Sequence, residues 1–286
     1  MKARPPGRSE VRRLLEEHSL EPSRALGQNF VVDPNTLDRI VRLAGVVPGD
    51  RVLEIGAGLG SLTLALCEAG ARVTALEIDR RLLPLLRDAV GDRAEIVEAD
   101  ALRADLGALL GAETTEGVLL VANLPYNIAT PLVVRVLEEL PQVRRLFVMV
   151  QREVGERFAA GPGNKDYGAV SVRIAYFATA RIVGRVSPEV FHPRPHVESA
   201  LVEITRREHP AVEAEVASYK EINRLLRAGF GTRRKMLRRS LLGLVDETAF
   251  NSAGVAPTDR AENLDVVAWG KLARWARSPM GSHTPN

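Results

Sequence analysis

The stretch "RVLEIGAGLGSLTLALCEAGARVTALEI" at residues 51–78 decides the fold. It opens with a short apolar run, passes through a glycine-rich turn into a segment of helical spacing, and ends with a second apolar run. Strands that are apolar on both faces and alternate with helices indicate a parallel sheet with helices on both of its faces. The stretch therefore predicts a β-α-β unit in which the glycine turn joins the first strand to the helix.

The same alternation continues along the chain. Further short runs rich in Val, Ile, Leu or aromatic residues occur at residues 94–99, 117–122, 145–151, 170–183 and 198–206. The last two runs lie close together, as an antiparallel pair at one edge of a sheet requires, and beyond them the pattern is polar and helical. We therefore expect an α/β domain with a mostly parallel, seven-stranded sheet at residues 1–206, and a small all-helical domain at residues 207–286.

Composition limits the class of protein. The chain has 286 residues, of which 45% are hydrophobic, and this is enough for a sizeable core. Its one cysteine, Cys67, excludes an intramolecular disulfide and fits a reducing cytosol. No apolar segment approaches the roughly 18 residues that a membrane span needs, and the N-terminal residues lack the apolar core of a signal peptide. We expect a soluble cytoplasmic protein with no membrane partner.

Four polar residues recur at a fixed interval. Glu54, Glu77, Asp100 and Asn123 are each 23 residues apart, and each falls at or just after the end of a predicted strand. The carboxyl ends of parallel strands share one edge, where ligands bind. Any one of the four residues could instead cap the helix that follows it. The recurrence of all four favours a common ligand crevice.

The glycine turn and the carboxylates indicate the ligand. Glycines at positions 56, 58 and 60 allow a sharp turn and a close approach of ligand to backbone. The dinucleotide fingerprint would need glycine at position 61, where this chain has Ser61. Glu77 is placed to accept hydrogen bonds from ribose hydroxyls, and Asp100 from the adenine amine. A carboxylate-lined site without Lys or Arg in its loop suits a positively charged nucleoside such as S-adenosylmethionine.

The fragment "VANLPYNIATP" at residues 121–131 follows the fourth strand and is expected to stand beside the transferred methyl group. Pro125 keeps Leu124 extended, so the Leu124 carbonyl can point into the site. The oxygen of Asn123 and this carbonyl could both accept hydrogen bonds from a substrate amine, while Tyr126 stacks on the base. The alternative is an ordinary turn that contains a core tyrosine. No strong base is needed, because attack on an activated methyl group depends mainly on positioning.

Several motifs together resemble the small-subunit ribosomal RNA adenine dimethyltransferases, the family whose loss gives kasugamycin resistance. They are "LGQNFVVD" (26–33), "EIGAGLGSLT" (54–63), "NLPYNIATP" (123–131), "QREVGERFAAGPGNKDYGAVSV" (151–172), "FHPRPHVESA" (191–200) and "FGTRRKMLRRSL" (230–241). The resemblance implies a Rossmann-like class I methyltransferase domain followed by a helical domain. It also implies S-adenosylmethionine-dependent N6,N6-dimethylation of two adjacent adenosines in the 3′-terminal hairpin of 16S rRNA, on an immature small ribosomal subunit. We expect a monomer without a metal ion.

The resemblance also implies site residues. The residues expected at the cofactor are Gln28, Asn29, Val31, Glu54, Gly56, Gly58, Gly60, Glu77, Ile78, Asp100, Ala101 and Asn123. Those expected at the reacting base are Asn123, Leu124, Pro125 and Tyr126, with Phe191 as a second stacking partner. Two departures are mild: Val31 stands where the family usually has leucine, and His196 where lysine is common.

Residues 224–240 carry seven cations and no acid. Such a run is often a solvated face, but an unbalanced run beside Gly229 and Phe230 favours nucleic-acid binding. We expect phosphate contacts from four of these cations, with Arg234 and Arg238 on one face of a helix. The four are Arg233, Arg234, Lys235 and Arg238.

The sequence leaves three other functions to be considered. A nicotinamide- or flavin-dependent oxidoreductase is disfavoured by Ser61. An RNA-binding assembly factor without turnover is disfavoured by the intact Asn123, Pro125 and Tyr126. A large-subunit rRNA adenine N6-methyltransferase of the erythromycin-resistance type is the nearest competitor, and the "FGTRRKMLRRSL" segment and Leu124 favour the small-subunit class.

Overall fold

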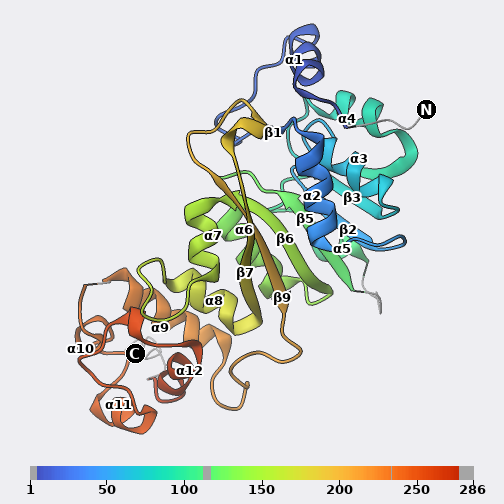
Figure 1. The fold of residues 1–286 in the computed structure, drawn as a ribbon. Helices are drawn as coiled ribbons and strands as arrows, with labels where there is room; N and C mark the ends of the chain where they lie inside the picture. The colour runs from blue at the N-terminus through green and yellow to red at the C-terminus, as the bar shows by residue number, and fades with distance from the viewer. Residues whose placement is uncertain (1–4, 112–116, 233, 277–286) are drawn as a thin grey trace, which may run out of the picture. The chain divides into compact units, whose positions relative to one another are not determined.

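The computed structural model describes residues 5–111, 117–232 and 234–276 (Figure 1). The chain divides into two compact units, one made of Met1–Glu156 and Ala180–Arg206 and the other of Arg157–Thr179 and Arg207–Asn286. The break after Arg206 coincides with the boundary expected from the sequence, but residues 157–179 belong to the second unit. They do so because apolar residues of this segment, Tyr167 and Val172 among them, pack into the core of the helical unit.

The first unit is built on a seven-stranded sheet of order β4-β3-β2-β5-β6-β9-β7. Its strands are β2 (Arg51–Ile55), β3 (Arg72–Glu77), β4 (Ala94–Glu98), β5 (Val118–Asn123), β6 (Val143–Gln151), β7 (Ala178–Val186) and β9 (Ser199–Arg206). The pairs from β4 to β6 are parallel, and β9 is antiparallel to β6. The predicted mostly parallel sheet of seven strands is therefore confirmed. A separate pair, β1 (Phe30–Val31) and β8 (Phe191–His192), is antiparallel.

Helices follow the strands, and they begin and end where the sequence has capping residues. Those of the first unit are α1 (Arg8–Glu17), α2 (Pro34–Ala44), α3 (Ser61–Glu68), α4 (Leu83–Val90), α5 (Leu106–Leu110) and α6 (Ala129–Glu139), and α7 (Arg152–Ala159) crosses the unit boundary. Helix α2 shows the local rule: the Asp33 side chain accepts the Thr36 N–H at its start, Pro34 occupies the first turn, and Gly45 ends it in the left-handed conformation.

One predicted strand is wrong in its first half. Residues Ala169–Phe177 form helix α8, and the strand begins only at Ala178. The run "VSVRIAYF" misleads because its buried residues Val172, Ile174 and Tyr176 alternate as they would in a strand. Gly168 precedes the helix as its N-cap. Its N–H donates to the Ser171 hydroxyl at 3.0 Å, and the Ser171 hydroxyl in turn donates to the Arg157 carbonyl at 2.6 Å. Tertiary packing thus overrides β propensity here.

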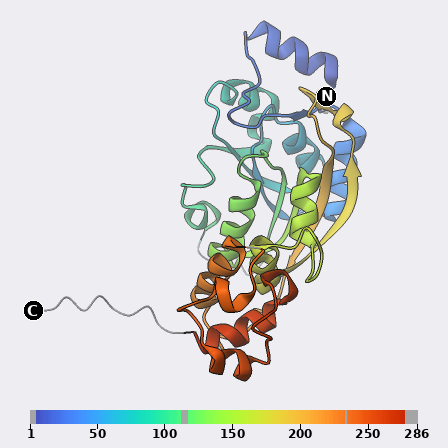
Figure 2. The same cartoon turned by 90° about the vertical axis from the view of Figure 1, so that its left-hand side faces the viewer.

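The second unit gathers helices around a tryptophan, and its part after residue 207 is drawn in orange to red in Figures 1 and 2. After α8 its helices are α9 (Tyr219–Gly231), α10 (Leu237–Ser240), α11 (Glu247–Ala253) and α12 (Val266–Arg274). Trp269 of α12 is fully buried. Its ring lies so close to Gly229 of α9 that a Cβ at this glycine would meet it at 2.6 Å. Gly229 therefore allows the close approach of the two helices.

The expectation that Arg234 and Arg238 share a helical face is wrong. Helix α9 ends at Gly231, and α10 begins only at Leu237. The chain between them is drawn away from a helical path because Met236 forms a β-bridge with Arg260 and the Leu237 N–H donates to the Asp259 carbonyl at 2.7 Å. Within the described part of the chain, no helix combines the length and apolar character needed to cross a membrane.

Candidate cofactor and active site

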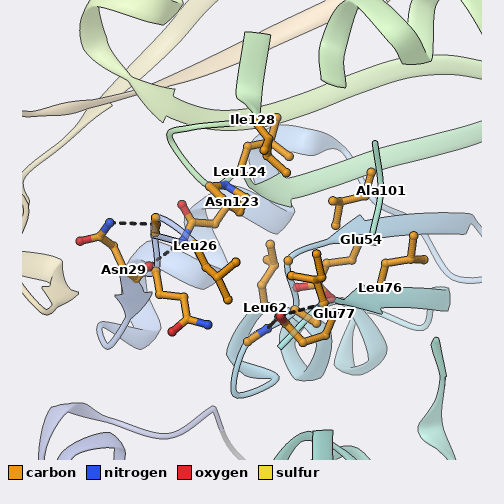
Figure 3. A pocket seen from close by; sticks show the side chains of 18 of the residues that line it. Leu26, Asn29, Glu54, Leu62, Leu76, Glu77, Ala101, Asn123, Leu124 and Ile128 are labelled. Atoms are coloured by element: carbon orange, nitrogen blue, oxygen red, sulfur yellow. Dashed lines mark hydrogen bonds between the residues drawn. The ribbon is translucent and has the colours of Figure 1, made fainter. Parts of the chain in front are cut away.

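A cavity of about 270 Å³ opens at the carboxyl ends of the parallel strands (Figure 3). Of the residues expected at the cofactor or the base, those that line it are Gln28, Asn29, Val31, Glu54, Gly56, Gly58, Glu77, Ile78, Asp100, Ala101, Asn123, Leu124, Pro125 and Tyr126. The 23-residue spacing therefore does bring four polar side chains to one crevice. All of the lining belongs to the first unit.

The glycine turn after β2 needs its glycines. Gly56, Gly58 and Gly60 have φ values of +78°, +59° and +82°. A Cβ at Gly58 would lie 3.0 Å from the Phe30 ring, and one at Gly56 would lie 3.2 Å from Pro125. Gly60 does not line the cavity, although it was expected at the cofactor: it precedes α3 and packs near Leu86 and Val90. Glycine is therefore favoured at these positions for two reasons: the backbone has a positive φ, and a Cβ would lie close to neighbouring side chains.

Ser61 is a site residue that the sequence argument missed. It lines the cavity at the first position of α3, and its buried hydroxyl has no hydrogen-bond partner among the described residues. Sequence reasoning used this serine only to reject the dinucleotide fingerprint. An unpartnered buried hydroxyl on a cavity wall is available to a ligand, since leaving it unpaired costs free energy.

Glu77 closes β3 and holds the glycine turn as well as facing the cavity. One carboxylate oxygen accepts the Gly58 N–H at 2.7 Å, and the other accepts the N–H groups of Ile78 at 2.9 Å and Asp79 at 2.8 Å. Burial raises the pKa of Glu77, and these three backbone hydrogen bonds oppose the rise. A replacement at Glu77 would therefore loosen the turn in addition to removing an acceptor for the ligand.

Glu54 lies deeper, at the end of β2. Its side chain is 2% exposed and accepts a hydrogen bond from the Thr63 hydroxyl at 2.6 Å. Burial raises the pKa of Glu54 to about 8; the Thr63 bond lowers it and the charge of Glu77 raises it further. A cation in the cavity would favour the ionised form of Glu54. The pair Glu54 and Glu77 thus makes one wall of the cavity receptive to positive charge (Figure 3).

Asp100 follows β4 in a loop that helix α6 holds in place. The Asp100 carboxylate accepts the Leu102 N–H at 2.9 Å. The guanidinium of Arg135 on α6 donates to the carbonyls of Ala101 at 2.7 Å and Ala104 at 2.8 Å. This anchoring fixes the loop that presents Asp100 and Ala101 to the cavity.

The end of β5 and the turn that follows it orient the Asn123 amide through a single backbone carbonyl. The Asn123 Nδ2 donates to the carbonyl oxygen of Asn29 at 2.9 Å (Figure 3). A carbonyl only accepts, so the amide nitrogen must face Asn29, and Oδ1 is left as the acceptor for another group. The Tyr126 hydroxyl lies 3.0 Å from the Ser199 hydroxyl on β9, and burial raises the pKa of Tyr126. The fragment therefore supplies an acceptor and a positioned aromatic ring.

Phe191 lies elsewhere than expected. It is fully buried in the core of the first unit, opposite Val31 in the β1–β8 pair, and it does not line the cavity. The geometry therefore gives no support to a stacking role for Phe191. Of the four expected phosphate-binding cations, Arg234, Lys235 and Arg238 are exposed in the second unit, and Arg233 lies outside the described residues.

The strand order, the glycine turn and the acidic cavity define a class I S-adenosylmethionine-dependent methyltransferase. The ribosomal RNA adenine dimethylase family matches residues 21–277, and the chain belongs to this family. Both the expected family and the expected cofactor are thereby confirmed.

Similar proteins agree with this assignment. The chain is 45% identical over 284 residues to ribosomal RNA small subunit methyltransferase A of Kineococcus radiotolerans, with 96% of this chain and 91% of that protein covered. It is 42% identical over 282 residues to the protein of the same name from Bifidobacterium adolescentis, with 94% and 93% covered.

Two solved structures share the fold. One is a dimethyladenosine transferase from Plasmodium falciparum, with a TM-score of 0.67, 24% identity, and 84% of this chain and 94% of that chain covered. The other is the 23S rRNA methyltransferase ErmE, with a TM-score of 0.65, 27% identity, and 86% and 99% covered.

Proposed function

We propose that this chain transfers methyl groups from S-adenosylmethionine to N6 of two adjacent adenosines in the 3′-terminal hairpin of 16S rRNA, two groups to each. Both curated relatives reported above are named for the small-subunit rRNA. We further propose that the chain works as a monomer in the cytoplasm and that its substrate is an immature small subunit.

The observation that carries the proposal is the hydrogen bond from Asn123 to the Asn29 carbonyl. Because it leaves Oδ1 of Asn123 as an acceptor at the cavity, an adenine amine can be held there with its lone pair directed at a methyl group. Tyr126, fixed by Ser199, provides the face on which the base stacks. Methyl transfer then needs alignment of the amine with the sulfonium methyl group and no strong base.

In the proposed cofactor site, Glu77 accepts from the ribose, Asp100 from the adenine amine, and Glu54 supplies negative charge. When it is bound, S-adenosylmethionine supplies the activated methyl group. The remaining lining, including Gln28, Ile78 and Ala101, encloses the nucleoside. We propose that the exposed cations Arg234, Lys235 and Arg238, together with Arg233, bind rRNA phosphates.

The test is methylation of unmodified small subunits and of unmodified large-subunit rRNA with the purified protein and labelled S-adenosylmethionine. Nuclease digestion and mass spectrometry should find N6,N6-dimethyladenosine at two adjacent positions of the 16S hairpin. Methylation of 23S rRNA alone would instead support the erythromycin-resistance type of activity. Binding of S-adenosylmethionine and RNA without transfer would support an assembly factor.

A further inference from the structure

One wall of the cavity is a segment without a regular helix, residues 23–31. Lining residues from this segment are Leu26, Gly27, Gln28, Asn29, Phe30 and Val31. Two amides, one at the end of β5 and one in the loop after it, reach this wall: Asn123 donates to the Asn29 carbonyl, and Asn127 Nδ2 donates to the Ala25 carbonyl at 3.0 Å. The backbone of the segment is therefore coupled to the fragment that carries the proposed catalytic amide.

A third contact ties the same segment to the loop after β3. The Gln28 Nε2 donates to the Asp79 carboxylate at 2.9 Å, and the Gln28 Oε1 accepts the Ser23 N–H at 2.7 Å. Both ends of the amide are thus occupied, and its orientation is fixed by a carboxylate that accepts and an N–H that donates. Gln28 in this position links residues 23 and 79, which belong to separate parts of the chain.

The surroundings of Asp79 keep its carboxylate in place for this contact. It lies two residues beyond Glu77, is 5% exposed, and is not one of the cavity's lining residues. Arg81 forms a bidentate ion pair with Asp79, in which Nε lies 2.9 Å and Nη2 lies 2.7 Å from the carboxylate oxygens. The hydrogen bonds from Arg81 hold the pKa of Asp79 at about 2, so the carboxylate stays ionised at working pH. A hydrogen bond to an ionised group is stronger than one between neutral groups.

We propose that Asp79 is a positioning residue that holds residues 23–31 closed over bound S-adenosylmethionine through Gln28. This inference rests on the proposed function, because it takes the cavity as the cofactor site. Closure has a second effect: it keeps the Asn29 carbonyl against Asn123 and so maintains the acceptor orientation of that amide. Cofactor retention and catalytic geometry therefore both depend on the contact between Gln28 of the cavity wall and Asp79, which does not line the cavity.

Gln28→Glu tests the contact, because it places a carboxylate against Asp79 while keeping an acceptor for the Ser23 N–H. The dissociation rate of S-adenosylmethionine should rise about tenfold, the size expected of a coupled pair of contacts, and KM for the cofactor should rise more than kcat falls. Asp79→Asn keeps an oxygen that accepts from Gln28, so its effect should be smaller.

The decisive variant is Gln28→Glu with Asp79→Asn, which restores the pair with donor and acceptor exchanged. The dissociation rate should return most of the way to the wild-type value. If the double variant releases the cofactor as fast as Gln28→Glu alone, Gln28 acts by touching the cofactor and the role of Asp79 is overturned. A single variant that loses thermal stability with an unchanged dissociation rate and KM also overturns it. Absence of S-adenosylmethionine binding by the wild-type protein would refute the proposed function instead.

Discussion

The guanidinium of Arg135 on helix α6 lies 2.7 Å from the carbonyl oxygen of Ala101, next to Asp100. A second bond to the Ala104 carbonyl makes this arginine the anchor of the whole loop after β4. The side chain is 20% exposed, so these bonds are partly shielded from water. The loop is therefore held by an element that follows the active-site fragment in the sequence.

Arg135→Met should weaken cofactor binding without unfolding the protein. It leaves two loop carbonyls without their donor, and hydrogen bonds to charged groups contribute about 1.5–3 kcal/mol each. Because part of this cost is recovered by water, we expect a rise of about tenfold in Kd for S-adenosylmethionine, measured by calorimetry. Glu139→Gln is the matched control, since it disturbs only the bond of Glu139 to Arg135 Nε. Equal effects of both changes would contradict the anchoring role.

Glu54 predicts a pH dependence of cofactor binding. Its pKa of about 8 in the empty protein lies above the ordinary value of 4.5, so its contribution to stability is complete below pH 4.5 and is lost as the pH rises through 8. A cation in the cavity lowers this pKa, so binding releases a proton. The affinity for S-adenosylmethionine should therefore rise from about pH 6 to about pH 7.5, approaching about tenfold per pH unit.

Calorimetry in two buffers with different ionisation enthalpies measures the number of protons released when S-adenosylmethionine binds. Glu54→Gln should abolish both the proton release and most of the pH dependence. Wild-type affinity that stays constant over this interval would show that Glu54 does not face the cofactor's positive charge.

The fold was largely predictable, and the contacts within the site were not. Apolar periodicity located β2 to β6, because buried parallel strands are apolar on both faces, and the 23-residue spacing located the crevice. The buried residues of α8 alternate as in a strand, so only tertiary packing decides that element. The proposed roles of Asp79 and of the Asn29 carbonyl could not be predicted from the sequence, because they depend on contacts between segments far apart in the chain. For Asn29, the role also depends on a backbone atom that every residue has.

Asn123→Ala should reduce transfer much more than cofactor affinity. The lost Oδ1 acceptor matters most as the amine approaches the methyl group, and removal of one positioned group of this kind typically costs about 100-fold or more in rate. Single-turnover rates at saturating S-adenosylmethionine measure the effect. Asn127→Ala also removes an amide bond to residues 23–31, so it shows how much of the loss comes from that segment. Comparable rates for the two variants would remove Asn123 from the proposed chemistry.

The last prediction concerns the exposed cations of the second unit. A flipped base gives little net binding after its unstacking cost, so phosphate contacts elsewhere must hold the RNA. Arg234 lies between α9 and α10 and Arg238 lies on α10, and both are exposed. Arg234→Glu with Arg238→Glu should weaken rRNA binding and lower its log–log salt slope by roughly one for each lost phosphate contact.

The matched control is Lys271→Glu with Arg274→Glu, which makes the same change in net charge on exposed residues of α12. S-adenosylmethionine affinity should be unchanged in both double variants, because every residue lining the cavity belongs to the first unit. If the two pairs weaken RNA binding equally, the effect is one of overall charge. If Arg234→Glu with Arg238→Glu methylates small subunits at the wild-type rate across a salt series, these two arginines form a solvated surface and the rRNA is bound by other residues.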